Sequence, residues 1–208
     1  MENKLITEDN WRNNVVSIAL EYANYIWTPT NKNAYHDYDI DGILVNTPDS
    51  NYISSKYDCG WWLVNQVNRG IPYNWGGCST IEDFNYGISV GKFAGNVPDS
   101  RDNGISKSCV GVDCSGLVTI CWGIAKKLST KSIPTIASPL NSMDLLLPGD
   151  VILLPGSHVM IFIDFVDETK THAQIVDASR NTGRVLLRTV QLLKLSNTGY
   201  IGYRKLNN

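Results

Sequence analysis

Apolar residues near the N-terminus recur with the period of a helix. Five of them follow one another at spacings of four, three, four and three residues: Trp11, Val15, Ile18, Tyr22 and Tyr25. This spacing places them on one face and predicts a helix over residues 9–27. Asp9 or Asn10 can cap its start, and Thr28-Pro29 ends it.

The middle of the chain is less regular. Residues 30–52 are polar and rich in turn formers, which indicates a long connection, and 95–110 reads as a surface loop. Short apolar segments predict three further helices, at 61–67, at 79–93 and at 117–128, the last opened by Cys114.

After residue 150 the pattern changes to that of strands. Apolar and β-branched segments separated by turn residues predict five strands, at 151–154, 158–165, 174–178, 185–190 and 200–204. Helices followed by antiparallel strands predict an α+β fold.

Composition and net charge exclude several classes of protein. The chain has 208 residues, of which 43% are hydrophobic and 18% charged, and its net charge is −2. This composition excludes a disordered chain, and the charge gives no basis for binding nucleic acid. No apolar run approaches the roughly 20 residues that span a bilayer. The N-terminus has no secretory h-region, so we expect a cytoplasmic protein, export without a signal, or a leader missing from this sequence.

The five cysteines are Cys59, Cys78, Cys109, Cys114 and Cys121. No two of them form a C-x-x-C pair, which argues against a zinc ribbon. The odd number leaves at least one thiol unpaired, and without a leader we expect mostly reduced thiols.

Cys114 lies in the stretch GVDCSGLVTICWG, at the expected start of a helix. A buried cysteine often serves only packing. At a helix N-terminus, however, the positive end of the helix dipole favours the thiolate, which is the nucleophilic form. Cys121 lies seven residues further on, within the expected helix, and we interpret it as packing.

A cysteine nucleophile needs a base, and the chain has three histidines. His36 lies in the polar connection and reads as a solvated surface residue. His158 opens an apolar strand after Pro155-Gly156-Ser157, where a side chain can face a cleft at the end of the sheet. A histidine that only satisfies the strand end is the alternative.

A third residue must orient the base. Pairing the strands around a turn at 166–171 places His158 roughly opposite Asp177, and opposed residues lie ~5 Å apart. The same register pairs His172 near Ile163, ~16 Å from His158 along the strand. Asp177 can therefore orient His158, whereas His172 cannot. A carboxylate that caps the turn into Ser179-Arg180 is the alternative for Asp177.

Four motifs, in order, give the chain its resemblance to the NlpC-type cell-wall cysteine peptidases of the papain-like clan. They are GIPYNWGG, VDCSGL, LLPGDVILL, and HVMIFI followed by IVDAS. Together they cover roughly residues 60–180.

The resemblance implies a papain-like α+β fold, in which an antiparallel sheet packs on the helix that carries the nucleophile. It implies hydrolysis of peptidoglycan stem peptides or muropeptides through an acyl-enzyme, with no metal or cofactor. By position, Cys114 is the nucleophile, His158 the base and Asp177 the orienting residue. The substrate site contains Tyr73, near the developing oxyanion, together with Asp113 and Ser115.

The chain departs from the family pattern in three places. The third catalytic position is often histidine in the family but is Asp177 here, and aspartate can do the same work. The gap before Cys114 is long, so we expect an insertion at 79–108. Residues 1–55, which we expect to form an N-terminal helical extension and linker, are too short for a typical wall-binding module. We expect residues 56–208 to form the peptidase domain.

Two kinds of alternative stay open. An acyltransferase or a deamidating toxin of the same clan would use the same triad, and an inactive papain-like domain would only bind. For a peptidase, Asp113 could hold the free amine of a stem peptide and direct cleavage to the γ-D-glutamyl–diamino acid bond. Alternatively, Asp113 caps the helix.

Overall fold

The computed structural model describes residues 2–54, 56–100 and 103–206. Contacts divide the chain into two compact units. Unit 1 comprises Met1–Glu21, Val118–Asp177 and Leu187–Asn208, and unit 2 comprises Tyr22–Leu117 and Ala178–Leu186. The division at residue 55 into an extension and a peptidase domain stays a prediction.

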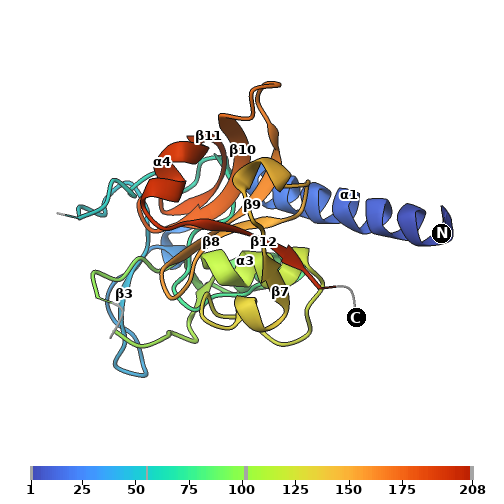
Figure 1. Cartoon of the computed structure of the whole chain (residues 1–208). Coiled ribbons are helices and arrows are strands. Elements are labelled where there is room, and N and C mark those ends of the chain that lie inside the picture. The colour runs from blue at the N-terminus through green and yellow to red at the C-terminus, as the bar shows by residue number, and fades with distance from the viewer. Residues whose placement is uncertain (1, 55, 101–102, 207–208) are drawn as a thin grey trace. The chain divides into compact units, whose positions relative to one another are not determined.

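Unit 1 is built on a six-stranded sheet with the order β11-β10-β9-β8-β12-β7 (Figure 1). Its strands are β7 Ala137–Pro139, β8 Val151–Leu154, β9 His158–Phe165, β10 His172–Ser179, β11 Arg184–Gln191 and β12 Ile201–Lys205. The pairs β7/β12, β8/β12, β8/β9 and β9/β10 are antiparallel. The mixed α/β class and the five predicted strands are confirmed, and β7 was not predicted.

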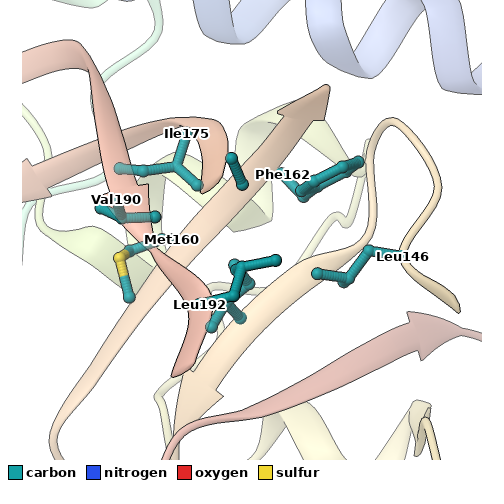
Figure 2. Packing of buried hydrophobic residues seen from close by; sticks show 8 residues of the cluster. Leu146, Met160, Phe162, Ile175, Val190 and Leu192 are labelled. Carbon is teal, nitrogen blue, oxygen red and sulfur yellow. The ribbon is translucent and has the colours of Figure 1, made fainter. Parts of the chain in front are cut away.

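A cluster of buried hydrophobic residues packs on one face of this sheet. Alternate residues of β9, such as Met160 and Phe162, point the same way because successive side chains of a strand face opposite sides. They join Leu146, Ile152, Ala173, Ile175, Val190 and Leu192, and Figure 2 shows the labelled members gathered against one another. Val159 and Ile161, on the other face of β9, are also buried, so this strand is covered on both sides.

The N-terminal helix is longer at its start and shorter at its end than the sequence predicts. Helix α1 spans Glu2–Asn24 rather than 9–27. It stops early because Ile26–Trp27 forms strand β1, whose partner is β4, Asn68–Arg69. The other helical segments of unit 1 are short: η2 Ile133–Thr135, η3 Met143–Leu145 and α4 Leu192–Asn197.

Unit 2 contains several small sheets, helical segments and a cluster of aromatic rings. Besides β1/β4, it contains η1 Asn31–Asn33, the hairpin β2 His36–Tyr38 with β3 Leu44–Asn46, and the parallel pair β5 Phe93–Ala94 with β6 Cys109–Val110. Trp27 lies in edge contact with Trp61, Trp62 and Phe84. Helix α2, Ile81–Ser89, confirms the helix predicted at 79–93 but is shorter, and Thr80 and Asp83 form its capping box.

Two predictions for helices need correction. Residues 61–67 form a turn instead of a helix, since Asn65 adopts a positive φ of 58° and the Asn68 side chain binds both backbone groups of Leu63. Helix α3 spans Cys114–Cys121 and therefore ends well before residue 128. Cys121 is its last residue, not a mid-helix residue as expected, and it is nonetheless buried.

Among the described residues, no helix combines the length and the apolar character needed to cross a bilayer.

Candidate active site

In unit 1 the first residue of β9 contacts a carboxylate of β10. Nε2 of His158 lies 2.7 Å from Oδ2 of Asp177. Asp177 is only 1% exposed, and the His158 side chain is 20% exposed, so one partner is buried and the other reaches solvent. The expected contact between these two side chains is confirmed, and their catalytic roles stay predictions.

The register that led to this expectation was wrong by two residues. Observed pairs place Ile175 across from Phe162 and Val176 across from Ile161, after an irregularity between Gln174 and Ile175. Continuing this register sets Asp177 across from Met160, and His158 is then its diagonal neighbour. A slip of two preserves the face to which each side chain points, so the contact survives.

His172 lies elsewhere than expected. Its carbonyl accepts a hydrogen bond from the backbone N–H of Val166 at 3.0 Å, so the expected pairing near Ile163 was wrong. The irregularity at Gln174 shifts this end of the hairpin by one residue more. His172 Nδ1 lies 3.0 Å from the Thr171 hydroxyl, at the turn end of β10 and remote along the strand from His158.

Sequence reasoning missed a third member of this group, Arg188 of β11. Its Nε donates to Oδ1 of Asp177 at 3.0 Å, and its NH2 group donates to Oδ2 at 2.8 Å. The geometry is the two-pronged pairing typical of arginine and carboxylate. The signal available in the sequence is an arginine in the predicted strand that follows the strand of Asp177.

The ionisation of Asp177 reflects opposing effects. Burial alone would raise the pKa of its carboxyl group. Hydrogen bonds from His158 and Arg188, together with their positive charges, outweigh burial and lower this pKa to about 2. Asp177 is therefore a carboxylate throughout the pH range in which a histidine titrates.

Replacing Asp177 with asparagine should destabilise the protein in a pH-dependent way. The folded pKa of about 2 lies below the ordinary value of 3.8. The charge therefore stabilises the fold above about pH 4, and this stabilisation is lost as the pH falls towards 2. The shift corresponds to about 2 kcal/mol at pH 7. Urea unfolding of both proteins at pH 7 and pH 2 measures the difference, and an equal difference at both pH values would contradict this assignment.

Unit 2 places Cys114 at the first residue of α3, where Asp113 caps the helix. Oδ1 of Asp113 accepts the backbone N–H of Gly116 at 2.6 Å and the Ser115 hydroxyl at 3.0 Å. Oδ2 accepts the N–H of Gly76 at 3.1 Å. Asp113, Cys114 and Ser115 are all buried. The structure thus shows the capping role, and the role of Asp113 in binding a substrate amine stays a prediction.

The glycines of two motifs meet beside this helix. A Cβ atom on Gly116 would lie 2.0 Å from the carbonyl oxygen of Gly77, so only glycine permits this approach. The thiol of Cys78 donates to the carbonyl of Gly116 at 3.6 Å. These contacts tie the first turn of α3 to the segment 76–78.

Tyr73 lies in the same part of unit 2. Its backbone forms an isolated bridge with Val112, two residues before Cys114, and its N–H donates to the carbonyl of Gly183 at 2.8 Å. The residue is buried. Unit 2 therefore brings together the segments that carry Tyr73, Asp113, Cys114 and Ser115, while His158 and Asp177 belong to unit 1.

His36 is exposed, as the sequence predicts, and its ring also contacts a buried carboxylate. Its Nε2 lies 2.8 Å from Oδ2 of Asp49, which is fully buried, and its own side chain is 34% exposed. Asp49 also accepts the Thr47 hydroxyl at 2.6 Å, and the His36 ring stacks on Tyr52. The pair links strand β2 to the turn after β3.

None of the five cysteines forms a disulfide. Three buried thiols other than Cys114 share a raised pKa. Burial raises the pKa of Cys59 and of Cys109 to about 12, and it also raises that of Cys121. These thiols are protonated at neutral pH and react slowly. Within the described residues, no three His, Cys, Asp or Glu side chains gather as a metal site would require.

A limiting dose of iodoacetamide at pH 7 should therefore alkylate Cys114 faster than Cys59, Cys109 or Cys121. Cys114 opens helix α3, while burial keeps the other three in the unreactive thiol form. Peptide mapping by mass spectrometry after short exposure gives the order of labelling. Labelling that begins at Cys59, Cys78 or Cys109 would count against a reactive Cys114.

Comparison with known proteins adds no relative of this chain. No family model, curated protein or solved structure matches this chain.

Proposed function

We propose that this protein is a cysteine endopeptidase or amidase of papain-like fold that hydrolyses peptidoglycan stem peptides through a thiol acyl-enzyme. The observation that carries the proposal is the contact between His158 and the buried Asp177 at 2.7 Å. Support also comes from Cys114, which is the first residue of a helix capped by Asp113. These residues have the types and surroundings that a nucleophile, a base and an orienting residue need.

The contact with Asp177 assigns the two ring nitrogens of His158. An ionised carboxylate accepts hydrogen bonds only, so Nε2 carries the proton that faces Asp177. In the neutral ring Nδ1 then holds the lone pair that can take up a proton. In the proposed mechanism Nδ1 is therefore the atom that exchanges a proton with the thiol, the leaving group and water.

The proposed reaction proceeds in two steps. His158 takes the proton of the Cys114 thiol, the thiolate attacks the amide carbonyl, and the backbone N–H of Cys114 helps to stabilise the oxyanion. His158 then gives the proton to the leaving amine, which leaves a thioester. In the second step His158 takes a proton from water and the hydroxide attacks the thioester. The thiolate of Cys114 leaves and takes that proton back from His158, which releases the acid and restores the thiol.

The proposed bond is that between γ-D-glutamate and the diamino acid. A carboxylate beside the nucleophile suits the free ammonium group of a stem peptide, and Asp113 occupies that position. Attachment to the sugar removes this ammonium group. We therefore expect free stem peptides to be cleaved faster than the same peptides attached to the sugar.

Product analysis of defined peptides tests this function. Free and sugar-attached stem peptides are each incubated with the protein, with and without an added amine acceptor, and the products are identified by mass spectrometry. The proposal expects hydrolysis at the γ-D-glutamyl bond, faster for the free form. Equal or faster cleavage of the attached form would reject the role of Asp113 as the amine-binding residue. Transfer to the amine in place of hydrolysis would indicate an acyltransferase, and no reaction of either form would reject the proposed substrate.

A further inference from the structure

We propose that Arg188 is a positioning residue for the His158–Asp177 pair, acting both on the orientation of Asp177 and on the proton affinity of His158. This inference rests on the proposed function, in which His158 carries protons. All three residues belong to unit 1 and lie on the adjacent strands β9, β10 and β11.

The contacts show how the carboxylate is held. Oδ2 of Asp177 faces both His158, at 2.7 Å, and the NH2 group of Arg188, at 2.8 Å, while Oδ1 accepts Nε of Arg188 at 3.0 Å. The side chain of Asp177 is 1% exposed, whereas that of Arg188 is 39% exposed. Two bonds in one plane fix the rotation of the carboxylate, and a single bond from histidine would not.

The guanidinium group of Arg188 also contacts the side chain of Met160. Its NH2 group lies 3.7 Å from the sulfur of Met160, on β9 between the positions of His158 and Phe162. The carboxylate of Asp177 raises the pKa of Arg188 further, so the group is always charged. Arg188 is therefore a fixed cation that reaches the buried carboxylate from the more exposed side.

The positive charge of Arg188 also affects the protonation of His158, because both groups contact the same carboxylate oxygen. A lone carboxylate at 2.7 Å would strongly favour the protonated ring, because opposite charges at this distance attract. Arg188 contributes a positive charge at the same oxygen and opposes that protonation. Among the described residues, the charged or titratable groups that act on Asp177 and Arg188 are His158 on β9 and Tyr200 before β12. In this proposal Arg188 lowers the affinity of the ring for its proton, which a general base must release.

Three variants separate charge from geometry. Arg188→Gln removes the charge, Arg188→Lys keeps the charge but cannot pair with both oxygens in one plane, and Arg184→Gln changes an arginine of the same strand whose NH1 donates to the carbonyl of Arg69. NMR titration of the His158 ring gives its midpoint for each protein. The rate of stem-peptide hydrolysis against pH is measured in parallel.

We expect the His158 midpoint to rise by about one pH unit in Arg188→Gln, with the acid limb of the rate profile moving by the same amount. Arg188→Lys should bring the midpoint back to within about 0.3 units of the original, yet kcat should stay about tenfold low because the carboxylate is no longer fixed. Arg184→Gln should change neither quantity.

Each result decides one part of the inference. A midpoint unchanged in Arg188→Gln overturns the charge effect, and full kcat in Arg188→Lys overturns the orienting effect. If Arg188→Gln does not fold, Arg188→Lys and its kcat still test orientation. The NMR midpoint does not depend on turnover. If the midpoint shifts in Arg188→Gln but the protein hydrolyses no stem peptide, the effect of Arg188 on His158 is supported and the proposed function is rejected.

Discussion

Replacing Cys114 with alanine should reduce hydrolysis of stem peptides by at least about a thousandfold, because the acyl-enzyme cannot form without the thiol. The fold should tolerate the change, since alanine fits the first turn of α3 and the cap from Asp113 binds backbone at Gly116. Initial rates per folded protein, followed by mass spectrometry of the products, provide the measurement.

Cys121→Ala is the matched control. Cys121 is the last residue of the same helix and is buried, so its replacement leaves a small cavity and lowers stability modestly. The rate per folded molecule should stay near that of the original protein. An active Cys114→Ala variant, or an inactive but folded Cys121→Ala variant, would show that the nucleophile has been assigned to the wrong thiol.

Replacing Asp150 with alanine should lower the free energy of unfolding by about 3 to 5 kcal/mol, because it breaks a buried network of charges. Asp150 is fully buried. Its Oδ1 accepts Arg12 at 2.9 Å, and its Oδ2 accepts the NH2 group of Arg204 at 2.7 Å and the N–H of Leu147 at 3.0 Å. Alanine would leave two arginines without their common carboxylate.

Urea unfolding at pH 7 measures this loss, with Glu168→Ala on an exposed turn as the control. Asp150→Asn keeps the shape of the side chain but not its charge, so its loss should be intermediate. A loss below about 1 kcal/mol for Asp150→Ala would show that the network contributes as little as an exposed ion pair.

The strands of unit 1 could be predicted to within about two residues at each end, since apolar residues and turn formers mark them directly. β8 and β9 have the predicted bounds. Their register could not be predicted, because the irregularity between Gln174 and Ile175 has no signal in composition. The His158–Asp177 contact survived the error only because the slip was an even number of residues.

The other errors arose where a structure depends on contacts that the local sequence pattern does not show. The segment 61–67 looked helical by its apolar content, but the side chain of Asn68 holds it as a turn. Arg188 was missed because a bidentate contact between β10 and β11 depends on three-dimensional neighbours. The cap formed by Asp113 was foreseen as an alternative, since aspartate before a helix commonly caps it.

The thiol acyl-enzyme can be tested directly. Reactions of the protein with a free stem peptide are quenched in acid at short times and examined by intact-protein mass spectrometry, followed by peptide mapping. We expect a transient mass increase equal to the acyl part of the cleaved peptide, located on Cys114 and absent from Cys114→Ala. Cleavage that continues after alkylation of Cys114, or an adduct on another residue, would contradict a mechanism in which Cys114 is the nucleophile.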